Sequence, residues 1–233
     1  LFDATELVMR DWNNIGGTLA RNNQGQYAVA RDRSRINKSY TKAFSENTEI
    51  DVALTFAPSG NPGGGLGQLV PDTRALDLRQ HITIFKLPDD NFRVRRTDPR
   101  VGYFGVSFKD YAAPIQGQLE QELAARHRLE RMNPNDPTSP IKNPIVYYID
   151  RGIPEPLRTA TLQGVGFWVE AFNRAGLPGG FKVELLPDGV DPMDARYNVV
   201  QWENRNERGW SIGGAITDPR TGHITQPHPF GAR

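Results

Sequence analysis

The four histidines are the side chains of this sequence best suited to metal chemistry, since the chain has no cysteine. In the H-E-x-x-H type of catalytic zinc site, two histidines four residues apart on one helix face and a third ligand hold the metal, and a glutamate takes a proton from the metal-bound water. None of His81, His127, His223 and His228 has a second histidine at that spacing, and His223 and His228 are five residues apart in a proline-containing segment. The sequence therefore predicts no zinc site within these residues.

A serine motif offers a second chemistry. Gly209–Gly213 fits the G-x-S-x-G pattern of serine hydrolases around Ser211, and Asp218 and His223 follow in the order of a catalytic triad. That pattern requires a helix directly after the serine, which two glycines and Pro219 disfavour. A serine hydrolase with Ser211 as its nucleophile is therefore the least favoured functional hypothesis for this sequence.

A short acidic cluster could hold a calcium ion. Asp188, Asp191 and Asp194 lie close together in a loop-like segment, and hard cations prefer oxygen ligands of this kind. Their spacing fits no EF-hand, so a solvated loop with helix-capping aspartates is the alternative.

Composition excludes two classes of partner. The formal net charge is +1, which provides no long-range field to attract nucleic acid. The chain has no apolar run long enough to cross a bilayer. We therefore expect neither nucleic-acid binding nor a membrane span.

Two regions of different character must position these side chains. Alternating apolar and polar residues predict strands near Tyr27–Ala30, Ile50–Phe56, Gln80–Lys86 and Val101–Lys109. The glycine-rich segment 58–72 is expected to be a mobile hairpin connection between the second and third of these. Residues 118–132 carry strong helix formers but also suit a strand entering the next domain. We expect a β-rich N-terminal domain at 1–133 and a proline-rich linker at 134–144.

The second region, 145–233, contains the most distinct helix. IVYYI is a short apolar strand, and apolar residues then recur at three- and four-residue steps from Pro154 to Ala175, before Gly176. The broad apolar face predicts a helix packed on a sheet. The fold class is therefore α+β, with a β-rich N-terminal domain followed by a mixed sheet and one long packing helix.

Several phrases together resemble one protein family. DPRVGYFGVSFKDY, IVYYIDRGIPEPLR, FNRAG, DARYNVVQW and DPRTG occur in this order, and the chain is similar to bacterial metzincin-like zinc metalloproteases with an uncharacterised N-terminal domain. The resemblance implies that 145–233 forms the upper part of a peptidase domain and that this chain is a fragment ending before the HExxH zinc helix. It also implies zinc in the full-length protein only, and an extracytoplasmic location.

The resemblance further implies where substrate would bind. It places an edge strand bordering the active-site cleft at Gly213, Gly214, Ala215, Ile216 and Thr217, where an extended peptide would pair through its backbone. Small side chains suit such strand addition. The expected partners are a peptide or protein substrate and the missing C-terminal part or another chain. The alternative is a non-enzymatic peptide-binding or structural assembly module.

Overall fold

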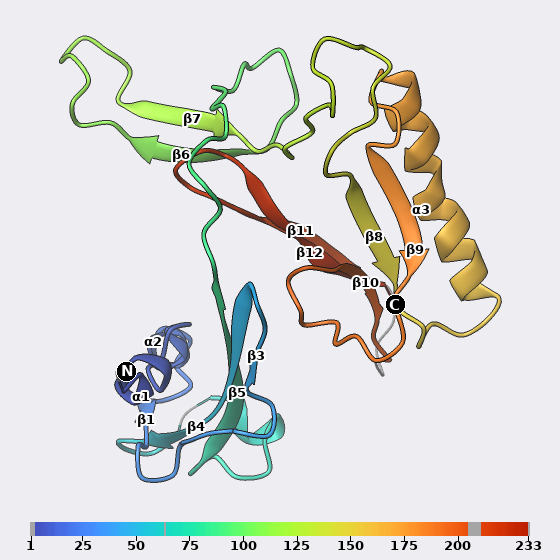
Figure 1. Ribbon diagram of the computed structural model, residues 1–233. Helices are drawn as coiled ribbons and strands as arrows, with labels where there is room; N and C mark the ends of the chain where they lie inside the picture. Colours follow the sequence, from blue (N-terminus) through green and yellow to red (C-terminus); the bar gives the residue numbers. More distant parts are fainter. Residues whose placement is uncertain (1–2, 63, 205–210, 233) are drawn as a thin grey trace. The chain divides into compact units, whose positions relative to one another are not determined.

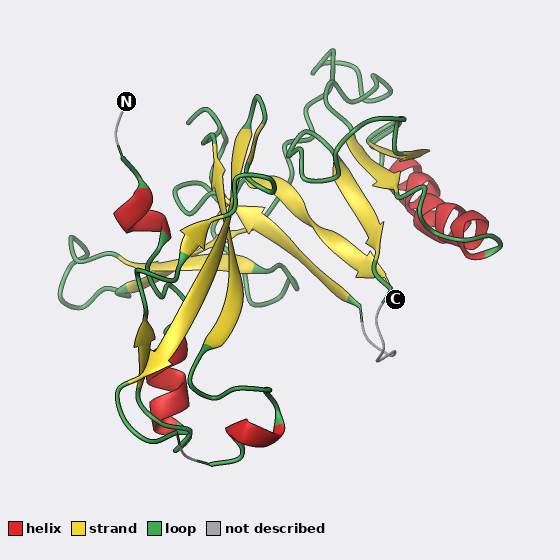
Figure 2. Cartoon of the chain, turned by 90° about the horizontal axis from the view of Figure 1, so that it is seen from below, coloured by secondary structure: helices red, strands yellow, loops and turns green. Residues whose placement is uncertain are grey.

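The computed structural model describes residues 3–62, 64–204 and 211–232. Contacts divide the chain into two compact units, Leu1–Phe85 and Lys86–Arg233. Both units are rich in strand, and one long helix packs on a sheet (Figure 2), which confirms the predicted α+β class. The predicted domain boundaries at 133/134 and 144/145 divide the chain differently and stay predictions.

The first unit is an antiparallel sheet built around one long strand, β4 (Asn47–Pro58). All the remaining described strands of the unit pair with β4. The other elements are α1 (Thr5–Val8), α2 (Ile15–Arg21), β1 (Tyr27–Val29), β2 (Arg35–Ile36), β3 (Lys42–Ala43), the 3-10 helix η1 (Leu66–Gln68) and β5 (Leu76–Phe85). The segment between β4 and β5 is a hairpin connection, as predicted, and its mobility stays a prediction. Leu66 within it is buried in the core.

The two faces of β4 have different chemistry. Val52, Leu54 and Phe56 point into the apolar core of the unit. The alternate residues Glu49 and Asp51 are also buried, although they are charged. A strand buried on both faces can carry such groups only if they are paired, because an unpaired buried charge is costly.

The second unit holds a mixed five-stranded sheet in the order β11-β12-β10-β8-β9 (Figure 1). Its strands are β8 (Ile145–Ile149), β9 (Phe181–Leu185), β10 (Asn198–Trp202), β11 (Ile212–Thr217) and β12 (Ile224–Ala232). The pairs β8–β9, β8–β10 and β10–β12 are parallel, whereas β11 is antiparallel to β12. β11 is therefore an edge strand with reversed direction.

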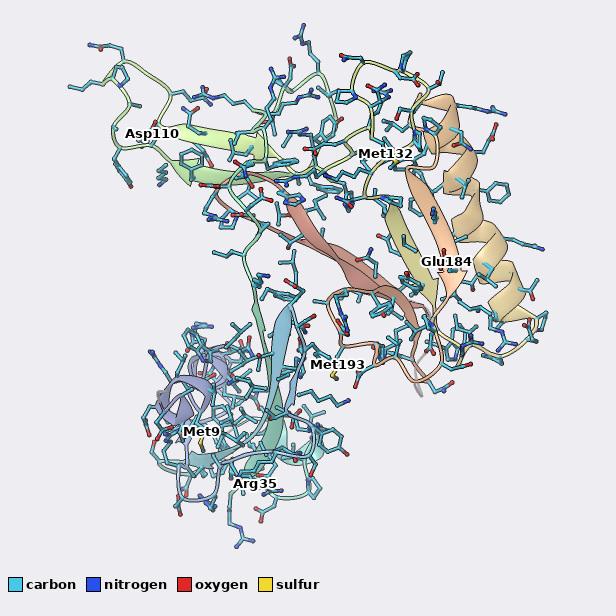
Figure 3. All side chains as sticks on the ribbon, in the orientation of Figure 1. Met9, Arg35, Asp110, Met132, Glu184 and Met193 are labelled. Carbon is cyan, nitrogen blue, oxygen red and sulfur yellow. The ribbon has the colours of Figure 1, made fainter. Side chains whose placement is uncertain are left out.

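Helix α3 (Leu157–Arg174) connects β8 to β9 and packs against both (Figure 1). It ends in a Schellman motif: Gly176 has φ +75°, its N–H donates to the Asn173 carbonyl, and the Leu177 N–H donates to the Phe172 carbonyl. Its apolar side chains meet the inward residues of β9, while Glu184 of β9 (labelled in Figure 3) is exposed. The predicted helix, its glycine stop and its packing on a sheet are confirmed. The packing face differs from the predicted stripe, because Phe167 and Trp168 are exposed and the helix packs through Leu162 and Val165.

The helical alternative for residues 118–132 is wrong. This region contains strand β7 (Glu120–Ala124), which pairs with β6 (Gly105–Lys109) in a two-stranded sheet. Leu123 and Ala124 are buried, and Leu123 also bridges to Arg96 on its other side. Pairing on both sides of the strand outweighs the local preference for helix.

Four turns share one local structure. In each Asp-x-Arg segment, the aspartate carboxylate accepts hydrogen bonds from the backbone N–H and the guanidinium of the arginine two residues later. The pairs are Asp72–Arg74, Asp98–Arg100, Asp194–Arg196 and Asp218–Arg220. Asp194 and Asp218 are buried, which makes these two turns parts of the packed unit.

Candidate functional site

The predicted substrate strand lies at an open position of the sheet. β11 stands at the end of the strand order, with β12 as its paired strand. Ile212, Gly213, Gly214 and Ala215 are exposed, and Ile216 and Thr217 are half-buried. An exposed edge with small side chains leaves backbone N–H and C=O groups accessible to another extended chain.

The turn after β11 is firmly held. The Asp218 carboxylate accepts from the Arg220 N–H at 2.9 Å, from Nε at 3.0 Å and from Nη2 at 2.7 Å. These donors, the Arg220 side chain foremost, lower the pKa of Asp218. Arg220 Nη2 also donates to the Pro88 carbonyl at 3.1 Å. The predicted turn at Asp218–Gly222 is confirmed, and it fixes the end of the β11–β12 hairpin.

A cavity that sequence analysis missed lies beside α3. Its volume is about 500 Å³, and its walls are largely apolar. The lining includes Trp168 and Phe172 of α3, Tyr147 of β8, Val200 of β10, His127 and Ser211. The only sequence signal was the bulky aromatic stripe of the helix, which is also what packing against a sheet requires.

His127 in the cavity wall is held neutral. Burial, and secondly the charge of His223, lower its pKa to about 4. A neutral imidazole can accept a proton or bind a metal ion. Among the described residues, however, no group of three or more metal-binding side chains comes together.

The structure gives the members of the possible serine triad other partners. Asp218 is engaged by Arg220, and the His223 ring stacks on Phe92 with centroids 4.6 Å apart. The His223 Nδ1 atom is shielded and has no hydrogen-bond partner among the described residues. Ser211 instead lines the cavity with His127. Gly209 and Trp210, part of the predicted motif, lie outside the described residues.

The other side chains weighed as metal ligands have partners of their own. His81 contacts Glu49, whose carboxylate also accepts from Thr83 at 2.6 Å. Asp188 forms an ion pair with Arg151 at 3.0 Å, and Asp194 is held by Arg196. This arrangement adds no support to the calcium prediction. The side chain of His228 lies outside the described part of the chain.

The family model described as Domain of unknown function (DUF5117) matches residues 1–132. This is more than half of the 233 residues, so the chain belongs to the DUF5117 family. No curated protein and no solved structure matches the chain. Within the described residues, no helix has the length and hydrophobicity needed to cross a membrane.

Proposed function

We propose that this chain is the non-catalytic portion of a zinc-dependent metalloendopeptidase, and that it supplies a sheet, a supporting helix and a substrate edge strand. Zinc and its ligands belong to other parts of the intact protein, which acts outside the cytoplasm. The observation that carries the proposal is the position of β11: it is the antiparallel edge of an otherwise parallel sheet. The resemblance to metzincin-like proteases implies a substrate strand at this place.

The chemistry required of β11 is backbone pairing. An extended peptide that adds to the edge gains main-chain hydrogen bonds whatever its side chains are. Gly213, Gly214 and Ala215 let the peptide approach closely because they have no large side chain. This role needs rigidity behind the strand, which the β12 ladder and the turn held by Asp218 and Arg220 provide.

Proline substitution in the whole protein tests the pairing. Gly214 and Ala215 pair in continuous register with positions 228 and 227 of β12, so their N–H groups point to opposite sides of the strand. We expect one of the variants Gly214→Pro and Ala215→Pro to fold normally and to raise KM for an unfolded protein about fivefold, the effect of one lost hydrogen bond of about 1 kcal/mol.

The other proline should break a β11–β12 hydrogen bond and destabilise the fold, which makes the two variants controls for each other. One outcome is that one variant folds stably with an unchanged KM while the other unfolds. That result would show that the edge does not hold substrate. Hydrolysis by the whole protein must also be abolished by a chelator and restored by zinc. Activity that survives removal of the metal would contradict the peptidase assignment.

A non-enzymatic assembly or peptide-binding module is the second candidate. The observation favouring it is the apolar cavity together with the exposed aromatic residues of α3, because Trp168 is 58 % exposed and Phe167 79 % exposed. Exposed apolar surface of this kind often marks contact with another segment or chain. A Trp168→Ala variant that dissociates a native complex, in a whole protein without zinc-dependent hydrolysis, would favour this candidate.

A further inference from the structure

A second cavity in the Lys86–Arg233 unit, of about 750 Å³, has four arginine side chains in its wall, together with Glu130 and apolar residues. Arg93 and Arg95 come from a segment that runs beside β7, where the Ala124 N–H donates to the Arg95 carbonyl at 2.8 Å. Arg126 lies two residues after the end of β7. Strand pairing therefore brings Arg93 and Arg95 to the same cavity as Arg126, which lies about thirty positions later in the sequence.

A buried aromatic ring, Phe92, holds Arg126 in place. Phe92 is 7 % exposed and lies at the centre of several cationic or basic groups. The Cζ atom of Arg126 is 4.8 Å from the ring centroid and that of Arg128 is 5.6 Å from it, while His223 stacks on the ring. These contacts fix the guanidinium groups of Arg126 and Arg128 before any ligand arrives.

The charges around the cavity are unevenly compensated. Arg128 forms an ion pair with Asp89 at 2.7 Å and lies 4.0 Å from Glu130. By contrast, no carboxylate of the described residues pairs with Arg93, Arg95 or Arg126. Arg126 Nη2 donates to the Arg93 carbonyl at 2.5 Å, but Arg126 Nε is shielded from solvent and has no hydrogen-bond partner in the described structure. Burial, and then the charges of Arg95 and Arg93, lower the pKa of Arg126.

We propose that the cavity bounded by Arg93, Arg95 and Arg126 binds an oxyanion group, either phosphoryl or carboxylate. An oxyanion would supply the missing negative charge and accept from planar guanidinium donors, which suit both groups. Three uncompensated cations favour the doubly charged phosphate over a carboxylate. This inference goes beyond the peptidase proposal and does not depend on it.

Calorimetric titration of the 233-residue chain with inorganic phosphate, and separately with acetate, tests the site. Ionic strength is held constant with sodium chloride, so that screening does not change between injections. We expect saturable binding of phosphate, weaker binding of acetate, and a loss of phosphate affinity of about tenfold in Arg95→Gln. Arg95 is exposed and no side-chain hydrogen bond fixes it among the described residues, so this variant should fold normally.

Arg174→Gln is the matched control, because it removes the same charge from the same unit but lies on α3, paired with Glu170. It should bind phosphate as the original chain does. Arg126→Gln should lose binding too, although it also removes the contact with Phe92. The proposal is overturned if phosphate binds no better than chloride, or if Arg95→Gln and Arg174→Gln bind it equally. Tighter binding of acetate that depends on Arg95 would support the site and identify carboxylate as its ligand.

Discussion

Replacement of Asp218 by asparagine should destabilise the Lys86–Arg233 unit through a single buried turn. The Asp218 side chain is 0 % exposed, and its carboxylate accepts from the backbone and side chain of Arg220. Asparagine keeps the shape but loses the charge and one acceptor oxygen. Because the Arg220 side chain stays 47 % exposed, water replaces part of the loss. We expect a cost of about 2 kcal/mol.

Asp98→Asn supplies the matched comparison, since Asp98 and Arg100 form the same Asp-x-Arg turn at an exposed position. Their side chains are 39 % and 86 % exposed, and an exposed pair contributes only about 0–1 kcal/mol. The two variants change the same atoms of the same motif. Their difference therefore isolates the effect of burial.

Differential scanning calorimetry measures both effects, because the two units of the chain can unfold in separate transitions. For Asp218→Asn we expect the transition of the second unit to fall by about 4–8 °C, while Asp98→Asn should shift it by at most about 2–4 °C. Equal shifts in the two variants would refute the argument from burial.

Acidification should reproduce the Asp218→Asn effect. The folded-state pKa of Asp218 lies below its usual range, so its contribution is complete above that range and is lost as the pH falls through the folded-state pKa. The original chain should lose stability over this interval more steeply than Asp218→Asn does. Parallel losses would contradict the assignment to this carboxylate.

Two further predictions concern backbone strain and histidine protonation. Gly222→Ala should cost about 2 kcal/mol in chemical denaturation, because Gly222 has φ +76° and an added Cβ would lie 2.5 Å from the Ala124 carbonyl oxygen. Gly189→Ala, with the same φ but open space around it, should cost only about 1 kcal/mol, and an equal cost would exclude the contact with Ala124 as the cause. His127 should titrate in an NMR experiment with a pKa of about 4. Its folded-state pKa lies below the unfolded value, so its contribution to stability is present above pH 6.5 and is lost as the pH falls toward 4; titration near 6.5 would show that the ring is solvated.

Local patterns predicted the elements whose stability is mainly local. The apolar stripe between Pro154 and Ala175 and the glycine at Gly176 identified α3. The proline and glycine of Asp218–Gly222 identified a turn. The short helices α1 and α2 were missed because four and seven residues carry too little periodicity to be recognised. Strand β7 remained ambiguous because its residues are strong helix formers, and its pairing with β6 and Arg96 is not visible in local propensity.

The cavities could not be predicted for a related reason. Arg93 and Arg95 form an R-x-R pattern that usually means an exposed face. Only the pairing of their segment with β7 brings them to Arg126. Only the ion pairs of the folded chain show that Arg128 has a carboxylate partner, whereas the other three arginines have none among the described residues. The edge strand was predictable as a strand, whereas its terminal place in the sheet depends on the order of all five strands.

Hydrogen exchange on β11 tests the central claim most directly. The whole protein is stripped of metal, which prevents cleavage under the proposed function, and amide exchange is followed with and without an unfolded protein such as reduced casein. Pairing with substrate should slow exchange within Ile212–Thr217, and Gly214→Pro or Ala215→Pro, whichever folds normally, should abolish that protection. Bound substrate that leaves the exchange of β11 unchanged would contradict the account.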